Sequence, residues 1–301
     1  MRRVKGREKM GSTKWLKRAI LVSGSILALK KGQQFLQKRA SFKQLTIGEE
    51  VATIPTVLIH GTNGTRRSLG GMIARWDKQG VAYKALDVEI SKAGKLQLNG
   101  HWQSFRTHKH PLVQVIFKEG DPPEWQQGAW VKEVLLLLKQ HLGIEEVYLM
   151  GHSMGGVAGL RYIVDNSFDP SLPRVKKLAV VGAPFNGEIV DSSGRTAYDL
   201  GPNGPVHASE TYRYFHTYRK SIPKSLAVFN VYGDLKNGSR SDGFVSVDSA
   251  RALGFLVKGK VASYREHLVL GLKAQHSLLH ENQQIDRLVA HFLWGAKSLI
   301  L

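Results

Sequence analysis

One hexapeptide constrains the fold of this chain more than any other feature. Gly-His-Ser-Met-Gly-Gly occupies residues 151–156, follows an apolar strand-like run at 147–150 and leads into a helix-like segment at 157–164. A serine between two glycines at a strand-to-helix junction is typical of a nucleophile elbow, in which a sharp turn presents the hydroxyl. Side chains at the two glycine positions would collide with the neighbouring strand and helix. The pattern predicts an α/β fold with Ser153 as the candidate nucleophile.

An earlier loop has the features of the other half of such a site. Residues 54–59 form a buried-strand run that ends in His-Gly-Thr-Asn-Gly at 60–64. A backbone N–H at such a strand end, together with the N–H after the nucleophile, forms an oxyanion hole. We expect the Thr62 and Met154 N–H groups to take this role. A phosphate-binding loop is the rival interpretation, but the lysine that it requires is missing from its position.

A serine hydroxyl needs a histidine to take its proton and a carboxylate to orient that histidine, in the chain order serine, acid, histidine. Asp242 lies in an Asp-Gly-x-Val loop after a predicted strand, and Asp234, directly after that strand, is the alternative acid. His276 falls between the last predicted strand and the last predicted helix. The other downstream candidates are less well placed: Asp248, His267, His280 and His291. We predict a catalytic triad of Ser153, Asp242 and His276.

The remaining chain alternates predicted strands and helices, which favours a single α/β domain. Strands are predicted at 81–90, 112–117, 175–181, 226–233 and 264–270. Helices are predicted at 68–79 and 125–142, and a last amphipathic helix follows residue 282 and runs through residue 294. We also expect a hairpin at 95–102, with Asn99-Gly100 at its turn. An irregular segment at about 188–224 predicts a small cap over the carboxyl ends of the strands. The alternative for its aromatic and basic run at 212–220 is a packed surface helix.

The distribution of charge argues against nucleic acid as a partner. The net charge is +19, but residues 1–44 hold 13 Lys and Arg against Glu8 alone, a net charge of +12. The remaining residues have 30 basic and 23 acidic side chains, a net charge of only +7. A nucleic-acid-binding domain concentrates basic residues on its folded body. We therefore expect no nucleic acid partner.

Metal and cofactor sites are also not indicated. The chain contains no cysteine, which excludes disulfides, a thiolate nucleophile and cysteine-based zinc sites. His101, His108 and His110 lie close together in sequence, but no carboxylate or helical spacing completes a metal site with them. We expect neither a metal nor a cofactor.

Residues 1–44 form a basic arm with a short apolar segment. Cationic residues 1–18 precede an eleven-residue apolar or small run at 19–29, which is shorter than the ~20 residues of a membrane-spanning helix. We predict that the arm is an uncleaved or signal-like segment that attaches the protein to a membrane. The larger charge before the apolar run favours a catalytic domain at 45–301 outside the cytoplasm. A peripheral basic tail on anionic lipid is the alternative.

Together, the elbow, the His-Gly-Thr-Asn-Gly loop, Ser-Asp-Gly-Phe-Val at 241–245 and His-Ser-Leu-Leu-His-Glu-Asn at 276–282 resemble a known family. These motifs are similar to those of surface-associated, lipase- and esterase-like α/β hydrolases of Gram-positive bacteria. The resemblance covers about residues 45–292, and the basic arm also resembles theirs. It implies the α/β-hydrolase fold, with a mostly parallel sheet and helices on both faces, and the same triad by motif match.

The residues predict a serine hydrolase, specifically a carboxylic ester hydrolase that acts on a small-molecule or lipid ester through an acyl-enzyme. Thioesterases, amidases and acyltransferases use the same machinery and stay open as alternatives. A membrane-tethered binding protein that keeps the fold without activity is a further alternative, because fold alone does not fix function. Nothing in the sequence indicates an oligomeric state.

Overall fold

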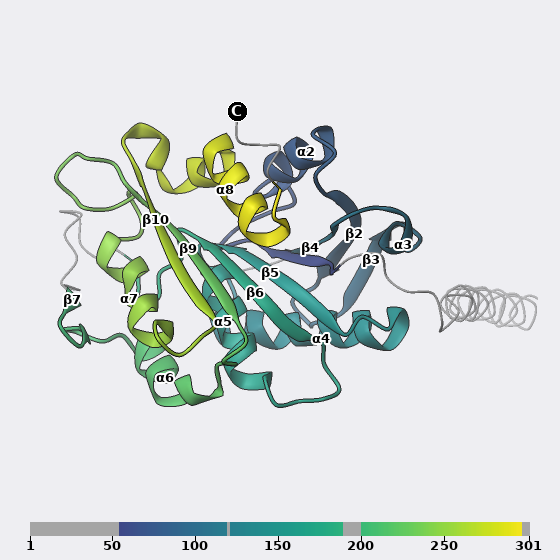
Figure 1. Ribbon diagram of the computed structural model, residues 1–301, viewed down its shortest axis with the longest axis horizontal. Helices are drawn as coiled ribbons and strands as arrows, with labels where there is room; N and C mark the ends of the chain where they lie inside the picture. Colours follow the sequence, from purple (N-terminus) through teal and green to yellow (C-terminus); the bar gives the residue numbers. More distant parts are fainter. Residues whose placement is uncertain (1–53, 119–120, 189–199, 297–301) are drawn as a thin grey trace, which may run out of the picture. The chain divides into compact units, whose positions relative to one another are not determined.

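The computed structural model describes residues 54–118, 121–188 and 200–296. An eight-stranded sheet runs through this part of the chain in the order β10-β9-β6-β5-β1-β4-β2-β3, and every neighbouring pair is parallel except β2 and β3 (Figure 1). The strands are β1 Thr56–Ile59, β2 Tyr83–Ile90, β3 Leu96–Gly100, β4 Pro111–Phe117, β5 Glu146–His152, β6 Arg174–Val181, β9 Ala227–Asp234 and β10 Ser263–Leu270, with a separate two-stranded ribbon of β7 Leu200–Gly201 and β8 Gly204–Pro205. The α-helices are α2 Gly70–Lys78, α3 Ser104–Thr107, α4 Glu124–Leu142, α5 Met154–Asn166, α6 Glu210–Tyr218, α7 Val247–Val257 and α8 Gln283–Trp294. The described ranges also contain three 3-10 helices: η1 Arg219–Ser221, η2 Leu272–Ala274 and η3 His276–Glu281.

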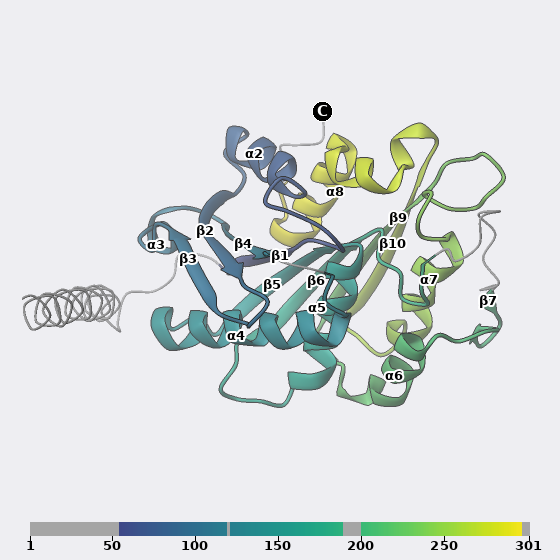
Figure 2. The same cartoon turned by 180° about the vertical axis from the view of Figure 1, so that it is seen from behind.

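Helices cover both faces of the sheet. Helices α4, α5, α6 and α7 lie on one face and α2 and α8 on the other (Figure 2). Parallel strands need a crossover connection, and the crossover helices bury both faces of the sheet. The predicted fold class, a mostly parallel sheet with helices on both faces, is confirmed.

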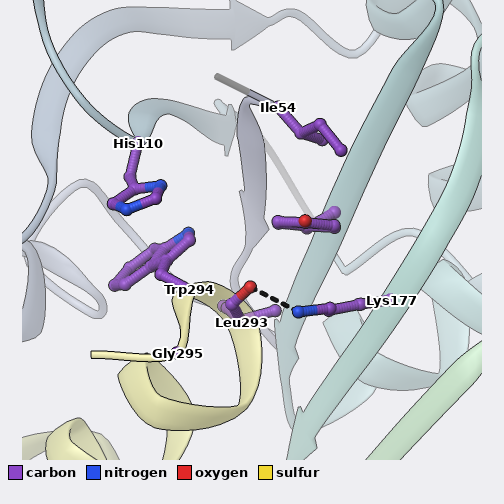
Figure 3. A pocket seen from close by; sticks show the side chains of 7 residues that line it. Ile54, His110, Lys177, Leu293, Trp294 and Gly295 are labelled. Atoms are coloured by element: carbon purple, nitrogen blue, oxygen red, sulfur yellow. Dashed lines mark hydrogen bonds between the residues drawn. The ribbon is translucent and has the colours of Figure 1, made fainter. Parts of the chain in front are cut away.

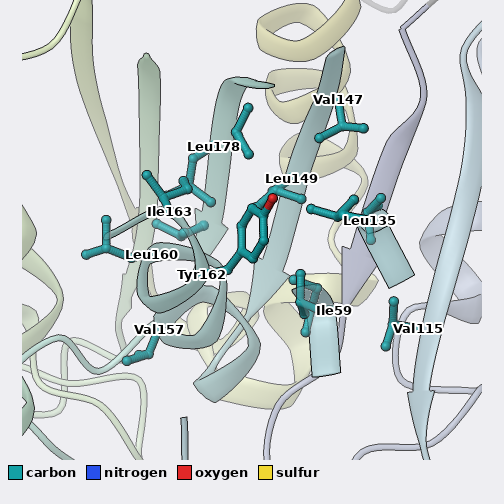
Figure 4. Packing of buried hydrophobic residues seen from close by; sticks show 14 of the residues in the cluster. Ile59, Val115, Leu135, Val147, Leu149, Val157, Leu160, Tyr162, Ile163 and Leu178 are labelled. Atoms are coloured by element: carbon teal, nitrogen blue, oxygen red, sulfur yellow. The ribbon is translucent and has the colours of Figure 1, made fainter. Parts of the chain in front are cut away.

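The alternation of side chains along β5 divides the core in two. Val147 and Leu149 pack in the cluster beneath α4 and α5, with Leu160 and Ile163 of α5 (Figure 4). Met150 points to the opposite face and packs in the cluster beneath α2 and α8. Because successive strand residues point to opposite faces, a continuous apolar run predicts a central strand that is buried on both sides. This buried strand is the rigid base from which Ser153 projects.

The hairpin predicted at 95–102 is wrong, because residues 96–100 form a single strand, β3, which makes a hairpin with the preceding strand β2 instead. Strand β3 pairs antiparallel with β2, and the chain reverses through residues 91–95, where the Ser91 N–H donates to the Lys95 carbonyl oxygen at 3.1 Å. Gly94 takes a left-handed φ of 74° in this turn. The predicted turn residues Asn99 and Gly100 instead end β3, where a Cβ on Gly100 would stand 2.2 Å from the Ala85 carbonyl oxygen. The glycine allows close packing against β2, and the predicted Asn-Gly turn is wrong.

Part of the segment predicted as a cap, 188–224, lies in the described residues and includes α6. Helix α6 lies in the crossover from β6 to β9, which pair parallel in the sheet. Its Phe215 is fully buried, and its Tyr214 donates to Asp165 at 2.6 Å and stacks on Arg161. Asp165 lies twelve residues after Ser153 along α5, or about 18 Å away at 1.5 Å per residue. Helix α6 is therefore a packed structural helix at the far end of α5, the alternative weighed for the run at 212–220.

Two predictions fall outside the described residues. The basic arm at 1–44 is one, and the part of the predicted cap at 189–199 is the other. Within the ranges that the structure describes, none of the helices combines the length and the apolar character that a membrane span requires.

Candidate active site

The nucleophile elbow has the geometry that its sequence predicts. Ser153 stands between the end of β5 and the start of α5 with φ 54° and ψ −131°, an unfavourable conformation for a residue with a side chain. A Cβ on Gly151 would stand 2.4 Å from the Gly156 nitrogen. A Cβ on Gly155 would stand 2.3 Å from the Ile59 carbonyl oxygen of β1. Both positions accept only glycine, because backbone already fills the space that a side chain would take.

The structure brings Ser153, His276 and Asp242 into one chain of hydrogen bonds. His276 Nε2 lies 3.0 Å from Ser153 Oγ, and His276 Nδ1 lies 2.8 Å from Asp242 Oδ2. A carboxylate only accepts, so Nδ1 carries the proton and Nε2 is left to accept from the serine hydroxyl. All three side chains are buried, and Asp242 is 1% exposed. The three groups come from separate loops, after β5, β9 and β10, whose strands end at the same edge of the sheet.

Backbone N–H groups of the loop that carries Asp242 hold its carboxylate in place. Asp242 Oδ1 accepts the backbone N–H groups of Phe244 at 2.9 Å and Val245 at 2.7 Å. The Val245 side chain packs beneath the loop against Tyr232 of β9. In addition, the His276 backbone N–H donates to the Asp242 carbonyl oxygen at 2.9 Å. The loop thereby holds both the orientation of the carboxylate and the start of the segment that bears His276.

The other acids and histidines considered for the triad make different contacts. Asp234 ends β9, and its carboxylate accepts the Lys236 backbone N–H at 2.8 Å. Asp248 opens α7 and pairs with Arg240 at 2.9 Å. Among the histidines, His267 lies on β10, His280 on η3 and His291 on α8. The structure gives none of these the hydrogen bond to Ser153 Oγ that His276 makes.

The loop after β1 lies directly against the nucleophile. A Cβ on Gly61 would stand 2.5 Å from Ser153 Cβ, so the backbone that leads to Thr62 touches the serine. The buried His60 ring holds this loop, because Nε2 accepts the Phe117 N–H at 3.0 Å and Nδ1 donates to the Gly61 carbonyl oxygen at 2.7 Å. Burial lowers the pKa of His60, in keeping with a neutral ring that donates at one nitrogen and accepts at the other.

The two N–H groups predicted for the oxyanion role belong to Met154 and Thr62. Met154 opens α5, and the first N–H groups of an α-helix have no acceptor within the helix. The positive end of the helix dipole adds to their attraction for an anion. Thr62 follows Gly61 and is half-buried, whereas Asn63 is exposed. Further along the same loop, Arg66 pairs with Asp87 and Glu89 of β2, which ties the loop to the sheet.

Sequence reasoning missed the role of His152 beside the nucleophile. This buried side chain donates from Nε2 to the His276 carbonyl oxygen at 3.1 Å. Its ring centroid lies 4.8 Å from that of His276 and 4.7 Å from that of His280. Burial, reinforced by the two neighbouring histidines, lowers the pKa of His152 well below 6.5, so the ring is neutral. The signal available in the sequence was its place inside the hexapeptide, at the end of a buried strand.

Sequence reasoning also missed Arg75, which braces the segment that bears His276. Arg75 of α2 donates to the His280 carbonyl oxygen at 2.8 Å and pairs with Glu281 at 2.7 Å, and these two acceptors belong to η3. It also bonds Asp286 of α8 at 3.1 Å. Hydrogen bonding to Asp286 raises the pKa of Arg75, while burial raises the pKa of the Asp286 carboxyl. No local pattern links residues so far apart along the chain.

A hollow at the opposite edge of the sheet lacks the features of a catalytic site. Figure 3 shows its lining, which includes Ile54 just before β1, His110, Trp294 and Lys177, so it lies at the amino ends of the strands. Lys177 Nζ donates to the carbonyl oxygens of Phe292 at 3.0 Å and Leu293 at 2.7 Å, at the carboxyl end of α8. A cation there balances the helix dipole, which is a structural role.

The three histidines considered as metal ligands are not grouped for that purpose. The His108 ring stacks on Tyr83, the His110 ring stacks on Trp294, and the His101 side chain is exposed. Across the described ranges, no three His, Asp or Glu side chains are arranged to hold a metal ion.

Comparison with known proteins agrees with this architecture. A protein-family model described as alpha/beta hydrolase of unknown function (DUF915) matches residues 46–296. The crystal structure of a gene product from Listeria innocua is similar, with a TM-score of 0.74 and 26% identity over 81% of this chain and 95% of that chain. A protein described as a candidate cell surface hydrolase from Lactobacillus plantarum shares the fold, with a TM-score of 0.68 and 18% identity over 83% of this chain and 96% of that chain.

A shorter match joins the chain to a curated relative. It is 37% identical over 49 residues to a proline iminopeptidase from Clostridioides difficile, and covers 16% of this chain and 16% of that protein. The family model, by contrast, spans almost the whole described region, and it confirms the resemblance to α/β hydrolases of Gram-positive bacteria that the motifs indicated. The chain belongs to the family of alpha/beta hydrolases of unknown function (DUF915).

Proposed function

We propose that the chain is a serine hydrolase that cleaves carboxylic esters through an acyl-enzyme. The observation that carries the proposal is the relay from Asp242 through His276 to Ser153, with distances of 2.8 Å and 3.0 Å. Nucleophile, base and orienting acid within hydrogen-bond reach are the signature of an activated serine. Membership of a hydrolase family and the strained elbow conformation of Ser153 give further support.

In the first half of the reaction, Ser153 Oγ attacks the ester carbonyl carbon while His276 Nε2 takes the hydroxyl proton. The carbonyl oxygen becomes an oxyanion, which the Met154 and Thr62 N–H groups stabilise. Collapse of the tetrahedral intermediate breaks the bond to the alcohol oxygen, and that oxygen leaves with the proton from His276. The acyl group stays bonded to Ser153 Oγ.

In the second half, a water molecule replaces the alcohol. His276 takes a proton from this water as the water oxygen attacks the acyl carbon, and it then returns the proton to Ser153 Oγ as the acid leaves. Asp242 stays ionised throughout, because its role is to fix the histidine tautomer and to stabilise the imidazolium that forms twice in each cycle.

Esters are the proposed substrates because an alcohol oxygen leaves more readily than an amine nitrogen. The same machinery serves thioesters, amides and acyl transfer, so a matched panel of acetyl ester, thioester and anilide substrates, with and without an added alcohol acceptor, ranks these reactions. We expect the highest kcat/KM for the ester. Faster turnover of the anilide would assign the chain to amide hydrolysis instead.

The test of the catalytic proposal is Ser153→Ala. We expect hydrolysis of a short p-nitrophenyl ester to fall by roughly 10⁴-fold or more in kcat, because the residual rate depends only on binding and the oxyanion hole. Circular dichroism verifies that the variant keeps its fold. Turnover equal to that of the wild type would refute the assignment of Ser153 as nucleophile.

We also propose that the basic arm at 1–44 attaches the enzyme to a membrane, with the catalytic domain outside the cytoplasm. The net charge of +12 beside an eleven-residue apolar run supports this proposal. The full-length protein is expected to pellet with membranes and to resist release by high salt, because apolar contacts are not screened by ions. Complete release by salt would indicate a peripheral tail, and protection from protease added to intact cells would indicate a cytoplasmic domain.

A further inference from the structure

Exposed hydrophobic side chains are concentrated in the acid loop and in the segment from β10 to η3 that bears His276. Among the described residues, nine large hydrophobic side chains are exposed, and five of them belong to residue 244 and the segment 268–278, on either side of the catalytic histidine. We call these five the apolar rim: Phe244, Leu268, Leu270, Leu272 and Leu278. Scattered exposed hydrophobic residues are ordinary, but a concentration of them marks a surface that meets another molecule.

The members of the apolar rim lie close together because β9 and β10 are parallel neighbours. Phe244 belongs to the acid loop after β9, is 56% exposed, and has its ring centroid 5.4 Å from that of His276. Leu272 belongs to η2 after β10 and is 84% exposed. A Cβ on Gly233 of β9 would meet both the Ala274 carbonyl oxygen at 2.2 Å and Asp242 Cβ at 3.0 Å, so the two segments pack on the same strand end.

The rim continues along a shallow hollow. Leu268, Leu270 and Leu272 line a space of about 540 Å³, together with Lys273 and with two residues at the start of α8. Strand β10 is an edge strand of the sheet, which leaves this side of the molecule uncovered by a further strand. The hydrophobic surface thus extends from the catalytic histidine to the edge of the sheet.

The charges around the rim are mainly basic. Lys236 in the acid loop and Lys273 in η2 are exposed and form no ion pair with any residue of the described ranges. The exposed carboxylates on this side are engaged, Glu281 by Arg75 and Glu266 by Arg251.

Asp234 is the exception among the acids of this side. It is half-buried, and its carboxylate accepts the Lys236 backbone N–H. Apolar side chains bordered by unpaired cations match the chemistry of an anionic lipid surface, into which apolar groups insert while cations remain at the headgroups.

We infer that the apolar rim docks the catalytic domain on an anionic lipid surface. The substrate is then an amphiphilic ester held in that surface, and its ester bond reaches Ser153 from there. The substrate half of this inference rests on the proposed function. A second copy of the chain is a poorer occupant, because a two-fold interface would bring the same basic surface, with Lys236 and Lys273, onto both facing sides.

The absence of cysteine from the chain makes a direct test available. An NBD fluorophore attached through Leu272→Cys in the full-length protein reports whether this position leaves water. The matched control is Phe168→Cys, because Phe168 is 80% exposed and lies after the far end of α5. Both proteins are mixed with phosphatidylcholine vesicles with and without phosphatidylglycerol. Because the same basic arm is present in both, membrane binding by the arm alone affects the two probes equally.

We expect a blue shift and a severalfold gain in emission at position 272 on the anionic vesicles, with no change at position 168. An unchanged probe at 272 on protein that pellets with the vesicles would overturn the inference. So would a shift at 272 that appears without vesicles and grows with protein concentration, since that result would indicate self-association. Neither readout depends on catalysis.

A second measurement examines the substrate half of the inference. In Leu272→Ser/Leu278→Ser, hydrolysis of a long-chain ester embedded in anionic vesicles is expected to fall at least tenfold, while hydrolysis of soluble p-nitrophenyl acetate stays within twofold. Phe168→Ser should alter neither rate. Equal loss on both substrates would overturn the substrate half. If the labelled Leu272→Cys protein inserts position 272 while the wild type hydrolyses neither ester, the enzyme assignment would be refuted and the docking left intact.

Discussion

Asp242→Asn is expected to keep the acid loop folded while giving His276 the wrong tautomer. Asp242 Oδ1 accepts two backbone N–H groups, from Phe244 and Val245, so only the amide oxygen of asparagine fits at that place. The amide nitrogen must then face His276 Nδ1 and donate to it. The imidazole proton moves to Nε2, which lies 3.0 Å from Ser153 Oγ and can no longer accept the hydroxyl proton.

The size of the effect follows from the loss of the general base. A triad whose histidine is held in the wrong tautomer loses about 10⁴-fold in kcat, as measured in other serine hydrolases. That loss corresponds to about 5 kcal/mol of activation free energy at 25 °C. The KM is expected to change little, because Asp242 is buried behind the histidine and has no access to bound ester.

The assay is steady-state hydrolysis of p-nitrophenyl acetate, with Asp234→Asn as the matched control. Asp234 accepts the Lys236 N–H through one carboxylate oxygen, and an amide oxygen accepts equally well. The control should stay within about twofold of the wild type, as expected for a substitution that removes no buried interaction. Near-normal activity of Asp242→Asn, or a large loss confined to Asp234→Asn, would refute the reasoning and move the acid to Asp234.

Three further predictions follow from the surroundings of the triad. His152→Leu removes the donor to the His276 carbonyl, so we expect kcat to fall about tenfold with KM unchanged and His152→Gln to restore most of it; equal losses in both variants would contradict a positioning role. Gly61→Ala puts a Cβ 2.5 Å from Ser153 Cβ, so the labelling of Ser153 by a fluorophosphonate should slow at least about tenfold. An unchanged labelling rate would show that the loop moves to make room for the methyl group. Burial lowers the pKa of His60 and His152, so the unfolded chain binds protons that the folded chain rejects as the pH falls through 6.5. The free energy of unfolding should therefore drop by up to about 1.4 kcal/mol per pH unit for each ring below that pH, and equal urea midpoints at about pH 7.5 and about pH 5.5 would contradict this.

Local pattern was enough to predict most of the sheet. The run predicted as a strand at 175–181 is β6 Arg174–Val181, and the run at 264–270 is β10 Ser263–Leu270. The helix predicted at 125–142 is α4 Glu124–Leu142, which ends at the left-handed Gly143. A strand buried on both faces appears in the sequence as a continuous apolar run, and a helix that ends at a left-handed glycine is marked by that glycine. The fold class followed from these elements and the elbow.

Contacts between distant residues could not be predicted in the same way. Asn99-Gly100 carries a strong turn signal, yet packing of the glycine against the backbone of β2 decides its place. Arg75 reaches η3 and α8 across more than 200 residues of sequence, and the partner of His152 is the carbonyl of a residue 124 positions later. Such pairs depend on how the elements pack, about which local periodicity carries no information.

Mass spectrometry of the protein after reaction with a fluorophosphonate tests directly whether Ser153 is the activated nucleophile. The reagent bonds to a serine that a neighbouring base has activated, so we expect a single adduct on the peptide that contains Ser153. The adduct should be absent from Ser153→Ala and should form much more slowly in Asp242→Asn. Folded wild-type protein that gains no adduct at neutral or mildly alkaline pH, or an adduct on a different serine, would refute Ser153 as the catalytic nucleophile.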